Sequence, residues 1–146
     1  MEQAMVEKIG ETTYRLGEIV FDTRTRELRV PVVVNMREGG PIEYLLVHET
    51  GKIHESIFVT SVSPTQLQIA LKLLKYHAAP GDVLDPILAP ENRQPGADRG
   101  DAVSFRFDPG DGSEAFSVSP MIIDRLVEQP MREEPLIYTG SKVENG

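Results

Sequence analysis

The sequence contains no cysteine and no long apolar run. The absence of cysteine excludes disulfides, thiolate metal sites, iron–sulfur clusters and cysteine nucleophiles. No apolar run approaches the roughly 20 residues that a membrane-spanning helix needs, so we expect no membrane span. The start of the chain, from Met1 to Lys8, lacks the basic flank and apolar stretch of a signal peptide. We therefore expect a periplasmic or envelope-associated protein if a signal was removed, and otherwise a cytoplasmic one.

Positive charge is also scarce. The chain has 15 Lys and Arg residues against 23 Asp and Glu residues, which gives a formal net charge of −8. Nucleic-acid binding depends on clustered cations, so we expect no nucleic-acid partner. The apolar fraction of 40% and the charged fraction of 26% are typical of a folded globular protein. A chain of 146 residues predicts a single domain over 1–146, with a loose N-terminal segment over 1–11.

Alternation of apolar and polar residues with a period of two predicts several strands. Residues 12–34 read as strands around Gly17 and a turn at 22–25, and Pro31 indicates an edge or a bend. Glu49-Thr50-Gly51 predicts the turn of a hairpin between two further strands. The remaining predictions are a hairpin of 102–107 with 114–118 and a last short strand at 136–138.

The pattern changes to a helical period after Ser63. Ser63 is the expected N-cap, Pro64 occupies the first helical position, and an apolar stripe follows at helical spacing, so a helix is predicted over roughly 64–76. Ser119-Pro120 opens a second candidate helix. Together these elements predict an α+β fold, a mainly antiparallel sheet with one long amphipathic helix packed on it and a second short helix. Residues 78–100, rich in Pro, Gly and Asp, form a long excursion between the elements.

The densest polar cluster lies around the predicted hairpin turn, where His48-Glu49 and His54-Glu55 flank it. Imidazole and carboxylate groups suit zinc and related ions, which makes His48, His54 and Glu55 candidate metal ligands. A two-residue turn would place the two histidines on opposite faces of the hairpin, whereas a three-residue turn would make them direct partners. The alternative is a hairpin with solvated charges, in which Glu49 pairs with Lys52.

Several segments resemble one bacterial family. They are Tyr14-Arg15-Leu16-Gly17, Phe21-Asp22, Thr25-Arg26-Glu27, Val34-Asn35-Met36-Arg37-Glu38-Gly39, Glu43-Tyr44-Leu45-Leu46-Val47, Gly51-Lys52-Ile53-His54-Glu55-Ser56, Leu67-Gln68-Ile69-Ala70-Leu71 and Tyr138-Thr139-Gly140-Ser141. As a set they resemble the YdjY-type domain, a family of no established function. The resemblance covers most of residues 12–75 and a patch near the end. It implies a location at the cell envelope and a chain shortened at its C-terminus relative to the family.

The family pattern includes His54, Glu55 and Ser56 but not His48. We therefore expect a non-enzymatic binding or accessory module of the cell envelope, with an unknown protein or small molecule as partner and without a cofactor. The candidate binding residues are Asn35, Glu43, His54, Glu55 and Ser56. The alternative is a metal-dependent or acid–base enzyme centred on His54 and Glu55. A third possibility is that residues 54–56 have only a structural role and stabilise the sheet.

Overall fold

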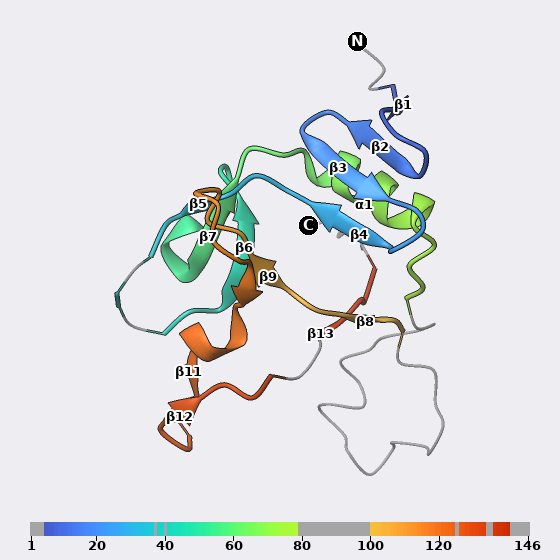
Figure 1. Cartoon of the computed structure of the whole chain (residues 1–146). Helices are drawn as coiled ribbons and strands as arrows, with labels where there is room; N and C mark the ends of the chain where they lie inside the picture. The colour runs from blue at the N-terminus through green and yellow to red at the C-terminus, as the bar shows by residue number, and fades with distance from the viewer. Residues whose placement is uncertain are drawn as a thin grey trace. The chain divides into compact units, whose positions relative to one another are not determined.

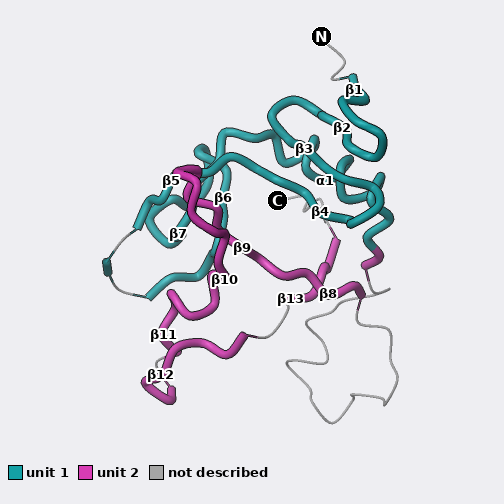
Figure 2. Tube along the Cα trace, viewed as in Figure 1, with its two compact units in different colours: residues 1–76 teal, residues 77–146 magenta. Residues whose placement is uncertain are grey.

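A computed structural model describes residues 5–36, 38–39, 41–78, 100–124, 126–133 and 136–140 of the chain. The predicted excursion therefore lies outside the described residues, apart from its two ends. The chain divides into two compact units, residues 1–76 and 77–146, where the sequence predicts a single domain (Figure 2).

The first unit contains two small sheets and the helix α1 (Figure 1). The first sheet is antiparallel, in the order β1-β2-β3-β4, and the second has the order β5-β7-β6. The elements are β1 (Glu7–Lys8), β2 (Thr13–Leu16), β3 (Ile19–Asp22), β4 (Glu27–Arg29), β5 (Val33–Val34), β6 (Tyr44–His48), the 3-10 turn η1 (Ile53–Glu55), β7 (Ser56–Thr60) and α1 (Pro64–Leu73). The pairing of β1 with β2 brings part of the N-terminal segment, predicted to be loose, into the first sheet.

The second unit has three two-stranded antiparallel sheets among its described residues. They pair β8 (Ala102–Val103) with β13 (Leu136–Ile137), β9 (Arg106–Phe107) with β10 (Phe116–Ser117), and β11 (Ile123–Asp124) with β12 (Gln129–Pro130), and the 3-10 turn η3 (Ser119–Met121) precedes β11. Asp101 ties two parts of this unit together, because it exchanges hydrogen bonds with His77 and its carbonyl accepts one from the Tyr138 N–H. Ala78 and Gly100 pair beside it in an isolated bridge.

The core of the first unit lies between the first sheet and α1, which covers one face of that sheet (Figure 1). Its buried members are Leu16, Ile19, Phe21, Val62, Ala70 and Leu74. The alternation in β3 explains this side of the core, because Ile19 and Phe21 are buried while Val20 and Asp22 are partly exposed. Gly17 adopts a φ of +59° in the two-residue turn between β2 and β3, a conformation that glycine adopts without strain.

The helix begins where the sequence predicts but ends earlier. Ser63 accepts a hydrogen bond from the Gln66 N–H at 3.4 Å, and Pro64 is the first helical residue. The helix stops at Leu73 because Lys75 takes a φ of +60° and Arg26 caps the free carbonyls. Arg26 donates from Nε to the Leu74 oxygen and from Nη2 to the Lys75 oxygen, both at 3.0 Å.

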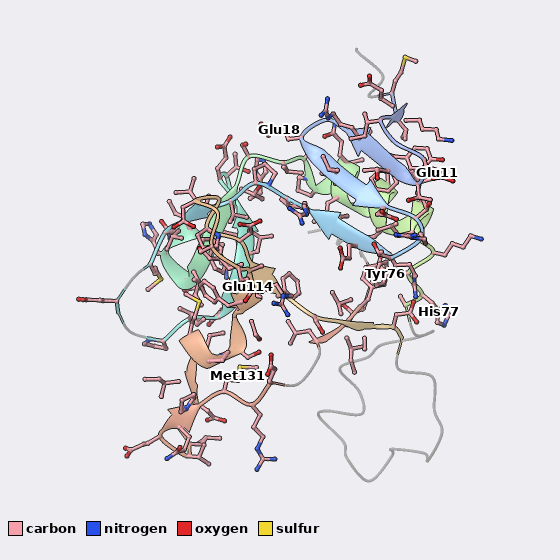
Figure 3. The ribbon with its side chains drawn as sticks, viewed as in Figure 1. Glu11, Glu18, Tyr76, His77, Glu114 and Met131 are labelled. Atoms are coloured by element: carbon pink, nitrogen blue, oxygen red, sulfur yellow. The ribbon has the colours of Figure 1, made fainter. Side chains whose placement is uncertain are left out.

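Tyr76, labelled in Figure 3, holds Arg26 in place from the other side. Its hydroxyl donates to the Arg26 carbonyl at 2.8 Å, and its ring lies under the guanidinium with 4.4 Å between the ring centroid and Cζ. Arg26 itself has a φ of +58°, in the left-handed region. The β3–β4 turn is therefore bound to the C-terminal end of α1 through a single arginine.

Three of the predictions about the fold are wrong. Of the described residues, 35% lie in strands and 15% are helical, and α1 is the single helix of seven or more residues among them, so the predicted α+β fold with a long amphipathic helix is not found and the described part is mainly β-sheet. The strands β6 and β7 run parallel, so they do not form the predicted hairpin. The predicted second helix is replaced by η3 and the β11–β12 hairpin. The chain turns back because the Asp124 carboxylate accepts the Leu126 N–H and Glu128 takes a φ of +52°. The Met131 N–H then donates to the Ile122 carbonyl across the hairpin.

Other predictions agree with the structure. β9 and β10 form the later hairpin, shorter than predicted, and residues 136–137 form the last strand. Pro31 lies between β4 and β5, which are edge strands of the two sheets. Of the residues that the structure describes, none belongs to a helix long and apolar enough to cross a membrane.

The turn after β3 makes a prediction about pH. Asp22 accepts hydrogen bonds from the N–H groups of Thr25 and Arg24, and these lower the pKa of its carboxyl below the ordinary 3.8. The ionised form stabilises the fold above pH 3.8, and we expect this contribution to disappear as the pH falls through the lowered pKa. A carboxyl NMR titration checks the pKa, and a midpoint of 3.8 or higher for Asp22 contradicts the prediction. In Asp22→Asn, which keeps an acceptor for the turn, this part of the pH dependence of stability is expected to be absent.

Candidate partner-binding surface at the β6–β7 crossover

The candidate site is built on the connection between β6 and β7, residues 49–55, which we call the crossover. It joins two parallel strands whose register pairs Tyr44 with Ser56 and His48 with Thr60. Parallel strands usually need a connection of a dozen or more residues, typically a helix. Here seven residues return the chain to the start of the neighbouring strand. The crossover must therefore turn sharply.

Two turns of the backbone make this short connection possible. The Gly51 N–H donates to the His48 carbonyl at 2.8 Å, and the Ile53 N–H donates to the Gly51 carbonyl at 3.0 Å. The 3-10 turn η1 then leads into β7. At its end the Glu43 N–H donates to the Glu55 carbonyl at 3.0 Å, which fixes the start of β6 beside the end of the crossover.

Asn35, which follows β5, fastens the crossover to the sheet. Its side-chain Nδ2 donates to the carbonyl oxygens of Ile53 and of Ser56, the latter at 3.1 Å. Its backbone N–H donates to the Ile57 carbonyl at 2.8 Å, which continues the pairing of β5 with β7. One side chain therefore satisfies carbonyls on both sides of the junction between η1 and β7.

Ser56 and Glu55 differ from the sequence expectation in their exposure. Ser56 is fully buried, and its hydroxyl donates to the carbonyl of Phe58 at 2.8 Å, so its side chain forms a hydrogen bond within β7. Glu55 is half-buried, and its Oε2 is buried without a hydrogen-bond partner among the described residues. A buried carboxylate oxygen without a donor is costly, which makes Glu55 the most notable polar group of the crossover.

The two histidines lie at different places. His48 ends β6, and its Nδ1 accepts the Thr50 N–H at 3.2 Å and lies 2.8 Å from the Thr50 hydroxyl oxygen. His54 lies in η1 and is exposed. The parallel register pairs His48 with Thr60, so neither of the two hairpin registers that the sequence left open is adopted. Within the described ranges, no group of three or more His, Asp and Glu side chains is placed to hold a metal ion.

Five of the exposed residues in and next to the crossover form what we call the crossover surface. They are Glu43, Tyr44, Glu49, Lys52 and His54, all of them exposed. The Lys52 ammonium lies over the Tyr44 ring, 5.9 Å from its centroid. Sequence reasoning singled out Glu43 and His54 for binding but not Tyr44, Glu49 or Lys52. A signal for this segment was present in the sequence, because Glu43 and Glu49 stand on either side of the uncharged strand Tyr44–His48.

Comparison of the chain with models of known families, with curated proteins and with solved structures finds no match. The resemblance to the YdjY-type domain stays a hypothesis.

Removal of the Asn35 amide is the sharpest test of this geometry. In Asn35→Ala the carbonyls of Ile53 and Ser56 each lose the hydrogen bond from Asn35, although the Ile53 carbonyl keeps the Ser56 N–H, and we expect the free energy of unfolding to fall by about 1–2 kcal/mol. The backbone amides of residues 53–56 are expected to exchange hydrogen faster, and the increase is expected to exceed what the lower global stability alone would cause. The exposed Glu38, on the same segment, provides the control Glu38→Ala, for which neither change is expected. Equal exchange in the two variants contradicts the role of Asn35.

Proposed function

We propose that the chain is a non-enzymatic binding module that contacts a protein partner through the crossover surface. The observation that carries this proposal is the fixation of a seven-residue connection by Asn35 while Lys52 and His54 stay exposed on it. Binding residues are commonly placed on loops that a rigid scaffold holds, because little conformational entropy is then lost on binding. The net charge of −8 favours a partner with basic groups over a nucleic acid.

The location of this binding module is a further part of the proposal. The resemblance to the YdjY-type domain favours the cell envelope, with the module acting as an accessory to an envelope protein. Fractionation tests this part separately. We expect the partner to be recovered from the envelope fraction of the source cell, and recovery from the cytosolic fraction alone contradicts the location.

Capture of the partner tests the proposed surface. The immobilised full chain is compared with the variants Lys52→Ala and His54→Ala, which change exposed side chains of the crossover. Glu11→Ala changes an exposed residue before β2 and is the matched control (Figure 3). We expect one protein to be retained by the wild-type chain and the control, and at least about tenfold less by the crossover variants, the effect of one lost contact of about 1.4 kcal/mol. Equal retention by all four chains overturns the proposal.

A second candidate function rests on Glu55. Its Oε2, which has no hydrogen-bond partner among the described residues, and the exposed His54 that precedes it in the chain favour the metal-dependent or acid–base alternative. Metal analysis of the native protein and titration with Zn²⁺ decide between the two functions. We expect no stoichiometric ion, because a metal site needs more ligands than this pair supplies. A stoichiometric ion that is lost in both His54→Ala and Glu55→Gln replaces the binding module with a metal centre.

A further inference from the structure

The strand β6 lies at the edge of its sheet, in the order β5-β7-β6. The hydrogen bonds at its two ends show which residues face β7: the Glu43 N–H donates to the Glu55 carbonyl, and the Glu49 N–H donates to the Thr60 carbonyl. Backbone groups of alternate residues point to opposite sides of a strand. The N–H and C=O groups of Tyr44, Leu46 and His48 therefore point away from β7, towards the open edge.

This edge is partly free. The His48 carbonyl accepts the Gly51 N–H, but the outward backbone groups of Tyr44 and Leu46 have no hydrogen-bond partner among the described residues. Tyr44 is 38% exposed and Leu46 is half-buried. Two residues of β6 therefore offer two donors and two acceptors in the spacing of an extended chain.

Among the described residues of the first unit, the other edge strands are protected and β6 is not. Proteins usually blunt a free edge with charged residues, proline or a very short strand. The edges of the first sheet carry Glu7 and Lys8 in β1, and Glu27 and Arg29 in β4, and the edge strand β5 has only two residues. In contrast, β6 has five residues, Tyr44–His48, without proline, Lys, Arg or a carboxylate. An unprotected edge of this length is a template for another strand.

The ends of the edge are acidic. Glu43 precedes β6 and Glu49 follows it; both side chains are exposed, and neither forms an ion pair with a described residue. Six residue steps separate the two, about 20 Å in an extended chain, which a peptide of about seven residues spans. If β6 paired in register with β6 of a second copy, carboxylate would meet carboxylate in either strand direction, Glu43 with Glu43 when parallel and Glu43 with Glu49 when antiparallel. The edge charges therefore disfavour self-association and favour a basic partner.

We propose that β6 accepts an extended peptide segment of the partner as an added strand, with apolar side chains alternating with basic ones. This inference rests on the proposed function and specifies the chemistry of its partner. The backbone of the added strand pairs with Tyr44 and Leu46, and its basic side chains reach Glu43 and Glu49. Such strand addition takes its affinity from main-chain hydrogen bonds and its specificity from the alternate side chains.

Synthetic peptides test the inference on the full chain. The probe is acetyl-KVKVKVK-amide, with acetyl-EVEVEVE-amide as the charge control and acetyl-KVKPKVK-amide as the backbone control, because proline removes a ladder donor. We expect saturable binding of the probe that is at least about tenfold tighter than that of either control, the effect of about 1.4 kcal/mol. The amides of Tyr44 and Leu46 are expected to exchange more slowly in the complex. Unchanged exchange at both amides overturns strand addition.

Two variants locate the added strand. Leu46→Pro removes an outward N–H that does not serve β7, and we expect loss of peptide binding with the fold retained, whereas Val47→Pro breaks an inward bond and is expected to unfold the sheet. The double variant Glu43→Lys and Glu49→Lys keeps every backbone group and does not depend on the tolerance of proline. It is expected to bind acetyl-EVEVEVE-amide in preference to the basic probe. An unchanged preference overturns the inference.

The two proposals fail in different ways. If the crossover variants lose the captured partner while peptides leave the Tyr44 and Leu46 amides unprotected, the binding module stands and strand addition is wrong. If the basic peptide protects those amides but Lys52→Ala and His54→Ala leave capture unchanged, the crossover surface is wrong and the edge of β6 is the binding element.

Discussion

Replacement of Phe21 by alanine is expected to lower the free energy of unfolding by about 3–5 kcal/mol, the usual effect of removing a buried aromatic side chain. Phe21 is only 2% exposed, and its ring stacks on Tyr14 with 5.7 Å between centroids. The ring lies in the cluster that joins β2 and β3 to α1, so the cavity affects both layers. The loss is a large part of the roughly 5–15 kcal/mol that stabilises an ordinary domain.

Urea unfolding followed by circular dichroism measures the effect. Phe116→Ala is a matched control, because Phe116 also lies in a strand and also contacts another ring but is 42% exposed. We expect the control to cost less than about 1.5 kcal/mol, the upper value for one aromatic pair. Similar losses in the two variants would show that the cluster around Phe21 is not the core of the first unit.

Arg26→Ala is expected to cost about 2 kcal/mol, although the side chain is mostly exposed and far from α1 in the sequence. The variant removes two charge-assisted hydrogen bonds to the carbonyls of Leu74 and Lys75 and the contact with the Tyr76 ring. Orphan carbonyls at a helix end need such partners. The helical signal in circular dichroism is expected to fall together with the midpoint of urea unfolding.

Two further variants separate the causes of this loss. Arg26→Gly removes the same side chain but relieves the left-handed backbone at φ +58°, so we expect it to be about 1 kcal/mol more stable than Arg26→Ala. Arg24→Ala removes an exposed arginine from the same turn and is expected to change stability by less than about 0.5 kcal/mol. If Arg26→Ala is no worse than Arg24→Ala, the long-range cap does not stabilise the helix.

The sequence predicts those parts of the fold that depend on neighbouring residues. The turn at Gly17, the alternation in β3 and the Ser63 cap were predictable because each depends on residues a few positions apart. The end of α1 was not, because it depends on Arg26, 48 residues before Leu74. The helix predicted over 64–76 is therefore too long, because it ends at Leu73.

The direction of β6 and β7 could not be predicted from local signals. Glu49-Thr50-Gly51 has the composition of a hairpin turn, and seven residues are normally too few for a parallel return. The deciding interaction is the Asn35 amide, which binds carbonyls 18 and 21 residues further along the chain. In the second unit, Ile122, Ile123, Leu126 and Val127 fit a helical period, but the turn at Asp124 folds them into a hairpin.

The candidate site was predicted in part. The structure brings the predicted residues together through their backbones, since Asn35 binds the Ser56 carbonyl and the Glu43 N–H binds the Glu55 carbonyl. It separates their roles, because Ser56 is buried while His54 is exposed. Exposure of each residue depends on the strand direction, which is why the sequence could locate the segment but not its accessible side chains.

The bridge between Ala78 and Gly100 makes the chain suitable for engineering. The bridge pairs Ala78 with Gly100, and the hydrogen bonds between His77 and Asp101 reinforce that junction. Because the entropy of closing a loop changes only slowly with its length, a connection of another length between Ala78 and Gly100 is expected to change the closure entropy only slightly.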